Sequence, residues 1–135
     1  MSRIRHAGGR VWEKMLKESG VDAFNGAQGR ILYVLWEHGA MTITEIGRLT
    51  SLAKTTLTSM LDRMQESGLI MRSPDRNNRR QIIVSVTDKA EEYREVYERL
   101  SERMNALTYA GFSESELLDY ERKLNRVLGN LEKGE

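Results

Sequence analysis

Apolar residues recur at helical spacing over most of the chain, which predicts a series of amphipathic helices. A first helix is expected from the N-terminus to about Ser19-Gly20. A second is expected from a cap at Asn25 to about His38, with Gly39 as its stop. The apolar positions are Ile4, Val11, Trp12, Met15 and Leu16 in the first helix, and Ile31, Leu32, Leu35 and Trp36 in the second.

Two further helices, separated by a short turn, are expected next. Thr42 is followed three residues later by Glu45, the spacing of a capping box, so a third helix begins there. Its inward residues are expected to be Ile43, Ile46 and Leu49. The fourth helix has its apolar stripe at Leu57, Met60, Leu61 and Met64 and ends at Gly68. A short helix, a turn and a longer helix in this order predict a helix-turn-helix.

An arginine-rich hairpin is expected immediately after the fourth helix. Residues 70–73 form its first strand, and a polar turn from Asp75 to Arg79 leads to a second strand over 82–86, in which apolar residues alternate. Pro74 suits a strand end rather than a central strand. The stretch 42–87 therefore predicts a helix-turn-helix followed by a two-stranded wing.

The last third of the chain predicts two long helices. One spans about 88–109, and the other opens at a capping box formed by Ser113 and Glu116. Their stripes are Tyr93, Val96, Tyr97, Leu100, Met104 and Leu107 in the first, and Leu117, Leu124, Val127, Leu128 and Leu131 in the second. These stripes exceed what a small core can cover, which favours burial against a second copy; an ordinary intramolecular bundle is the alternative.

The expected fold is mainly α with a small β-hairpin wing, in one domain over 1–135. A winged helix-turn-helix lobe at 25–87 lies between dimerisation helices at 1–20 and 88–135. The chain lacks cysteine, an apolar signal core and any apolar run of membrane-spanning length. We therefore expect a cytoplasmic protein without disulfides and without a membrane partner.

The charge distribution singles out the same region. The net charge is only +1, but residues 54–89 hold seven Lys/Arg against four Asp/Glu, whereas residues 90–135 hold seven against eleven. Charge runs often only solvate a surface. Here the basic excess coincides with the helix-turn-helix and wing, which favours a polyanionic partner, double-stranded DNA.

The residues expected to contact DNA lie on the fourth helix and on the wing. Small hydroxyl side chains let a helix sit deep in the major groove, and flanking cations can reach phosphates. Arginines at a hairpin tip can enter the minor groove. A merely solvated helix face and turn is the alternative. The candidates are Lys54, Thr55, Thr56, Thr58, Ser59 and Arg63 on the helix, and Arg72, Arg76, Arg79 and Arg80 on the wing.

Other classes of function find less support in the residues. The only histidines are His6 and His38, and no cysteine or glycine-rich phosphate loop is present, so we expect no enzyme and no cofactor. Glu37 and His38 supply fewer ligands than the four or so that a zinc site needs. A winged helix used only for protein contacts remains the alternative, although such a wing should expose apolar residues rather than arginines.

The chain resembles the MarR (multiple antibiotic resistance regulator) family of winged-helix transcription regulators. The segments that carry the resemblance are Leu61-Asp62-Arg63-Met64, Glu66-Ser67-Gly68-Leu69-Ile70, Arg72, Asn78-Arg79-Arg80 and Val84-Ser85-Val86-Thr87. The resemblance covers nearly the whole chain, with six helices and the wing between the fourth and fifth. It implies an obligate homodimer with intertwined first, fifth and sixth helices, which would bind a pseudo-palindromic operator, most often as a repressor.

The resemblance also assigns individual roles. It makes Arg80 the minor-groove arginine and Asp62 a salt-bridge anchor for a wing arginine. Asn78 stands where the family commonly has aspartate. Many members bind a small aromatic or anionic effector between the dimer helices and the DNA-binding lobe. Trp12, Met15, Tyr33 and Trp36 are the candidates for lining such a site, with ordinary core packing as the alternative.

Overall fold

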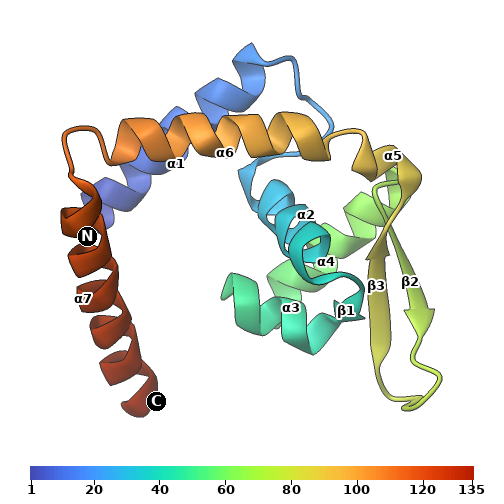
Figure 1. The fold of residues 1–135 in the computed structure, drawn as a ribbon. Helices are drawn as coiled ribbons and strands as arrows, with labels where there is room; N and C mark the ends of the chain where they lie inside the picture. The colour runs from blue at the N-terminus through green and yellow to red at the C-terminus, as the bar shows by residue number, and fades with distance from the viewer. The chain divides into compact units, whose positions relative to one another are not determined.

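Seven helices and three short strands follow one another in a computed structural model that describes all residues, Met1–Glu135 (Figure 1). Met1–Glu102 form one compact unit and Arg103–Glu135 a second. The elements are α1 (Ser2–Glu18), α2 (Gly26–His38), β1 (Met41–Thr42), α3 (Ile43–Thr50), α4 (Lys54–Glu66), β2 (Ile70–Pro74), β3 (Ile82–Val86), α5 (Asp88–Glu91), α6 (Arg94–Thr108) and α7 (Glu114–Lys133). The predicted class, mainly α with a small β wing, is confirmed.

The caps expected from the sequence set the helix boundaries. Asn25 and Gln28 form a reciprocal capping box at the start of α2. Gly39 ends that helix with φ of 80°, a left-handed value that glycine adopts without steric cost. Thr42 accepts a hydrogen bond from the backbone N–H of Glu45 at 3.1 Å and so caps α3. Local side-chain chemistry thus positions the two helices around the central turn.

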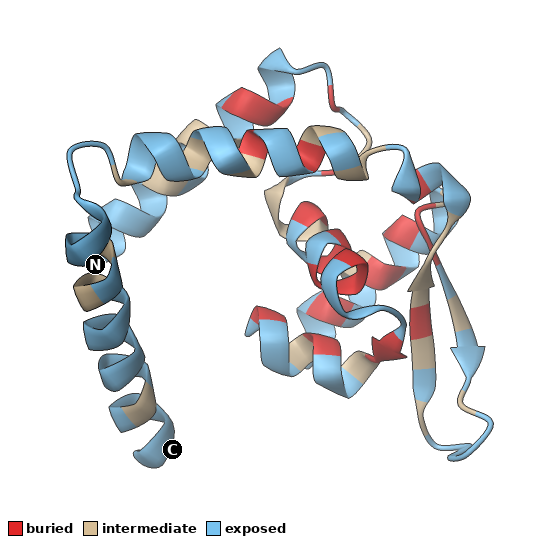
Figure 2. Ribbon diagram, viewed as in Figure 1, coloured by how far each residue is buried: buried red, intermediate tan, exposed pale blue.

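The core of the first unit lies among α2, α3, α4, the start of β2 and the middle of β3, where buried positions gather in Figure 2. Its fully buried side chains include Ile31, Leu35, Ile46, Leu61, Met64, Ile70 and Val84. Most of the predicted stripe of the fourth helix is confirmed, because Leu57, Leu61 and Met64 are all buried. Burial of about 1.5–3 kcal/mol per large side chain fixes how α4 is oriented.

The prediction that Leu49 of the third helix faces inward is wrong. Leu49 is 38% exposed, and its neighbour Thr50 is buried instead. The hydroxyl of Thr50 donates to the carbonyl of Ile46 at 2.7 Å, which satisfies its polar group inside the core. The last turn of α3 therefore places a small β-branched residue, rather than leucine, in the core.

The wing belongs to a three-stranded antiparallel sheet of order β1-β3-β2. β2 and β3 pair from Ile70 opposite Val86 to Pro74 opposite Ile82. β1, which the sequence pattern did not predict, pairs Met41 with Val84. The sheet therefore anchors the middle of β3 to the segment that leads into α3.

The expected single helix over 88–109 is interrupted. α5 ends at Glu91, and α6 begins at Arg94. Between them the N–H of Tyr93 donates to the carbonyl of Ala90, three residues earlier, which is the 3₁₀ pattern rather than the α-helical one. The Tyr93 ring packs edge-on against Phe24, with ring centroids 5.6 Å apart. This break gives seven helices where six were expected.

The second unit consists of the end of α6 and α7. Ser113 and Glu116 form the predicted capping box at the start of α7. The hydrogen bond from the Ser113 N–H lowers the pKa of the Glu116 carboxyl. α7 has no fully buried residue (Figure 2). Of its predicted apolar stripe, Leu117 is half-buried, and Leu124, Val127, Leu128 and Leu131 are exposed. None of the helices is both long and apolar enough to span a bilayer.

Candidate nucleic-acid interface

α4 presents a polar surface because its apolar stripe is fixed in the core. All six of its candidate contact residues are exposed: Lys54, Thr55, Thr56, Thr58, Ser59 and Arg63. The N-cap residue is Ala53, which makes no side-chain cap. The N–H groups of the first turn therefore lack a capping side chain, an arrangement that suits an anionic partner.

The turn between α3 and α4 depends on one residue in a left-handed conformation. Ser51 has φ of 58°, the only positive value among the non-glycine residues. Its N–H donates to the carbonyl of Gly47 at 2.9 Å, which closes α3. This turn brings the first residues of α4 to the surface directly beside the end of α3.

The tip of the wing is organised by side chains that bond to the backbone. Asp75 accepts a hydrogen bond from the N–H of Asn77 at 3.0 Å, and Asn78 accepts one from the N–H of Arg80 at 3.1 Å. These are Asx turns, which stabilise a hairpin without using a basic side chain. Arg76, Arg79 and Arg80 are exposed and form no ion pair within the protein.

Arg72 differs from the other wing arginines. Its Nη2 lies 2.7 Å from Asp62 Oδ1, and its Nε donates to Gln65 Oε1 at 2.7 Å. Asp62 is therefore an anchor for a wing arginine, and that arginine is Arg72. Sequence reasoning missed the contact between Gln65 and Arg72, because no spacing rule links a residue of a helix to a residue of the strand that follows it.

Three of the four candidate effector residues gather around Tyr97 of α6. Its ring lies 5.1 Å from Trp12, 5.7 Å from Tyr33 and 5.5 Å from Trp36, measured between centroids. Burial, with a further contribution from Tyr33, raises the pKa of Tyr97 to about 12. Met15 is also buried. The indole Nε1 of Trp36 is buried without a hydrogen-bond partner, which is unusual for a donor of this kind.

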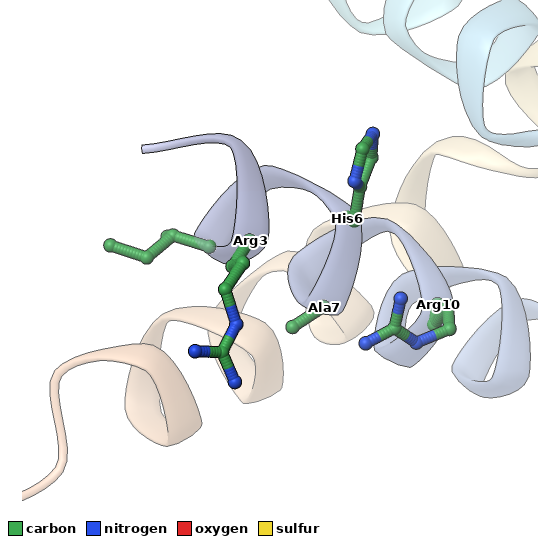
Figure 3. A pocket seen from close by; sticks show the side chains of 5 residues that line it. Arg3, His6, Ala7 and Arg10 are labelled. Atoms are coloured by element: carbon green, nitrogen blue, oxygen red, sulfur yellow. The ribbon is translucent and has the colours of Figure 1, made fainter.

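A hollow beside α1 lies outside the predicted contact residues. It is lined by Arg3, Ile4, His6, Ala7 and Arg10 of that helix. In Figure 3 the arginine side chains extend on either side of Ala7, whereas His6 projects in another direction. The hollow is formed by α1 alone and shares no residue with α4 or the wing.

Comparison with known proteins decides the family. Residues 24–82 match the model of the MarR family. The chain belongs to the MarR family. The matched residues run from just before α2 to the start of β3, so they include α4, Arg72 and all the arginines of the wing tip. The elements that carry the candidate interface are thus the ones that MarR-family proteins share.

Relatives and solved structures are similar over different parts of the chain. The HTH-type transcriptional regulator TtmR of Methylorubrum extorquens is 36% identical over 84 residues, which cover 62% of this chain and 42% of TtmR. The chain spans less than half the length of the first curated relatives that it matches. A mutant MarR from E. coli complexed with operator DNA has a TM-score of 0.78 and 25% identity, covering 94% of this chain and 92% of that one. Reduced AbfR bound to DNA has a TM-score of 0.72 and 26% identity, covering 96% and 87%.

Proposed function

We propose that this MarR-family protein is a transcriptional regulator that binds double-stranded DNA sequence-specifically. The observation that carries the proposal is the pairing, in one lobe, of an outward helix face rich in hydroxyls with a wing that carries three unpaired arginines. The similarity to E. coli MarR complexed with operator DNA supports it. Such a protein would act in the cytoplasm, where a bacterial operator is accessible.

The chemistry of each element suits a different groove. Thr55, Thr56, Thr58 and Ser59 are small enough for α4 to enter the major groove, where hydroxyls and threonine methyls can meet base edges. Lys54 and Arg63 flank them at positions that face phosphates. The wing extends away from the helices, so its arginines are free to approach the adjacent minor groove, where the potential is most negative (Figure 1).

We propose a homodimer, with Ser2–Glu18 and the helices after the wing as the dimerisation elements. α7 exposes Leu124, Val127, Leu128 and Leu131, and α1 exposes Ile4, so large apolar side chains lack a partner within the chain. Two copies would place two recognition helices on an inverted repeat, about 10–10.5 base pairs apart. Sedimentation should give about twice the 15.5 kDa chain mass. A monomer at micromolar concentration would contradict this part of the proposal.

We also propose repression as the outcome of binding, relieved by a small aromatic or anionic effector near Trp12, Met15, Tyr33 and Trp36. The support for this second candidate function is the buried Nε1 of Trp36, because a carboxylate or hydroxyl of a ligand would accept its hydrogen bond. Calorimetric titration with simple aromatic acids tests it. Binding that Trp36→Phe abolishes would support the site, and no binding to any of them would contradict it.

Selection from a random DNA pool with the purified protein tests the main proposal. An enriched inverted repeat is the expected result, and Thr55→Ala should relax the preference at one position of each half-site. A pool that stays random would favour the alternative, a winged helix that contacts proteins without specific DNA binding.

A further inference from the structure

We propose that Glu13 of α1 is a positioning residue that sets which spacing of operator half-sites the protein prefers. Its Oε1 accepts a hydrogen bond from the backbone N–H of Gly26 at 2.7 Å. Gly26 is the first residue of α2, so the bond joins the proposed dimerisation helix to the DNA-binding lobe. This inference rests on the proposed DNA-binding homodimer, and it concerns a residue that lies outside α4 and the wing.

The start of α2 is bonded by side chains from two different helices. The first N–H groups of an α-helix have no partner within the helix. Asn25 Oδ1 accepts the N–H of Gln28 at 2.9 Å, and Gln28 Oε1 accepts the N–H of Asn25 at 3.1 Å. The N–H of Gly26 is bonded by Glu13, whose negative charge also suits the positive end of the helix dipole. Glu13 therefore links two helices, whereas Asn25 and Gln28 only cap one.

Gly26 makes room for this carboxylate. A Cβ at position 26 would lie 2.5 Å from Glu13 Oε1 and 3.1 Å from Trp12 Cδ1. The first distance is shorter than real Cβ contacts, so any larger residue at this position would push the carboxylate away from the amide. Glycine is the residue that permits such a close approach to the backbone. Glu13 and Gly26 are thus matched, and their bond can be broken by a substitution on either side.

The bond is directional, whereas the neighbouring contacts of α1 are mainly apolar. Trp12 packs edge-on against Tyr97 of α6, with ring centroids 5.1 Å apart, and Met15 and Leu16 are buried. Apolar burial depends on area rather than direction, so it tolerates some rotation of one helix on another. A hydrogen bond weakens steeply when its angle changes. No backbone hydrogen bond joins α1 to α2, so Glu13 supplies the polar contact that fixes the angle between them.

A change in the angle between α1 and α2 would move the recognition helix. α2 and α4 share one core, in which Ile31 and Leu35 of α2 and Leu57 and Leu61 of α4 are buried, so the lobe turns as a unit. Two-fold symmetry applies the same turn to both lobes of a homodimer. Both lobes therefore contribute to the change in separation of the two recognition helices, and with it to the half-site spacing that these helices fit.

Amide hydrogen exchange tests whether this link between the helices exists in solution. Glu13 is exposed, so Glu13→Ala should leave the protein folded while it removes the acceptor. We expect exchange at Gly26 to rise about tenfold, the lower end of the range for a hydrogen bond to a charged group. Glu13→Gln keeps an acceptor oxygen and should retain most of the protection. Equal exchange in the wild type and Glu13→Ala would overturn the inference at this first step.

Operators with variable spacers test the consequence for DNA recognition. Two half-sites of the selected inverted repeat would be separated by spacers that differ by single base pairs, and affinity would be measured for each duplex. We expect the wild type to prefer one spacing. Glu13→Ala should reduce the affinity ratio between the best and the next spacing by about tenfold, the worth of the lost bond. Its affinity for an isolated half-site should match the wild type. A uniform loss of affinity at every spacing would overturn the positioning role.

Three further variants decide whether the hydrogen bond is the cause. Gly26→Ala displaces the carboxylate without removing it, so it should broaden the spacing preference as Glu13→Ala does, and the double variant should broaden it no further. Glu13→Gln should keep the wild-type preference. Glu18→Ala should keep it too, because Glu18 is an exposed carboxylate of the same helix that pairs only with Lys14.

The outcomes for spacing and for binding are separable. An unchanged spacing preference in Glu13→Ala, or a broadened one in Glu13→Gln, would overturn the positioning role of Glu13 while leaving DNA binding intact. Failure of the wild type to bind any of the duplexes would overturn the proposed function and the spacing role together. The exchange result at Gly26 would then still show whether the two helices are linked.

Discussion

Arg72 Nη2 on β2 lies 2.7 Å from Asp62 Oδ1 on α4, and this ion pair ties the wing to the helix that we place in the major groove. Gln65, one turn further along α4, accepts a second bond from the same guanidinium. Arg72 is thus held at two points by one helix. This arrangement fixes the angle between wing and α4, and through that angle the spacing of their contacts along DNA.

Removing Asp62 should therefore weaken DNA binding even though it removes a negative charge. We expect Asp62→Ala to lower operator affinity several-fold, because the wing loses its fixed orientation. The change in free energy of unfolding should stay within about 1 kcal/mol, since the pair is partly exposed and screened by solvent. Fluorescence anisotropy and chemical denaturation measure the two effects.

Glu66→Ala provides the matched control for Asp62→Ala. Glu66 is an exposed carboxylate on the same helix and forms no ion pair. Its loss should leave affinity unchanged or raise it, because it only reduces repulsion from phosphates. If both variants shift affinity in the same direction, the ion pair does not position the wing.

Asn78 should act through the backbone of the wing rather than through an arginine side chain. Its Oδ1 accepts the N–H of Arg80 at 3.1 Å, and an aspartate can accept the same bond. We therefore expect Asn78→Asp to leave the hairpin ordered and to change affinity by less than about 1 kcal/mol. Asn78→Ala should instead increase amide exchange at Arg80.

Asn77→Ala is the control for this prediction. The Asn77 side chain forms no hydrogen bond, and only its backbone N–H is engaged, by Asp75. Exchange at Arg80 should match the wild type in that variant. Equal protection in Asn78→Ala and the wild type would show that the Asx turn contributes nothing to wing order.

Gly29 should not tolerate a methyl group, although it lies in a helix. A Cβ there would lie 3.0 Å from Cε2 of both Phe24 and Tyr97, and both rings are buried. Overpacking of this kind costs about 1–3 kcal/mol, which should exceed the gain of about 1 kcal/mol in helix propensity. We expect Gly29→Ala to lower the free energy of unfolding.

Gly47→Ala tests the gain in helix propensity without overpacking. A Cβ at Gly47 would meet Leu57 Cδ2 at 3.6 Å, an ordinary contact. This variant should be more stable than the wild type by about 0.4–1 kcal/mol, as measured by denaturation. Stabilisation of similar size by Gly29→Ala would show that the aromatic cluster adapts and that the close approach is not a constraint.

Because of Tyr97, the free energy of unfolding should fall as the pH becomes strongly alkaline. Its pKa is raised to about 12, mainly by burial, so the folded state holds the proton more tightly than the unfolded state. The corresponding stabilisation is complete below about pH 10 and is lost as the pH rises towards 12. Spectrophotometric titration should show a step at about 12 that Tyr97→Phe removes and Tyr120→Phe retains. If Tyr120→Phe removed the step instead, the group that titrates at about 12 would be Tyr120 and the prediction for Tyr97 would be wrong.

The features that sequence analysis predicted well are those set by local chemistry. Asn25, Thr42 and Ser113 cap helices in the structure as their spacing indicated, and Leu57, Leu61 and Met64 are buried as their period required. The fold class and the family followed from these elements and from the motifs around the wing.

The features that were missed depend on contacts between distant segments. A two-residue strand such as β1 has no period to detect, and it exists because Met41 pairs with Val84. Leu49 was expected to face inward, but Thr50 is buried instead, because the tertiary packing of a short helix overrides its apolar pattern. The partner of Asp62 was expected to be a wing arginine, but only the folded hairpin shows that it is Arg72.

The central claim, specific DNA binding by this MarR-family protein, is tested most directly by one ratio of dissociation constants. Anisotropy titrations at one fixed salt concentration would compare the selected inverted repeat with a scrambled duplex of the same length and composition. We predict that the selected site binds at least about a thousandfold more tightly, the lower end of the range for specific regulators. Equal affinity for the two duplexes would contradict the claim.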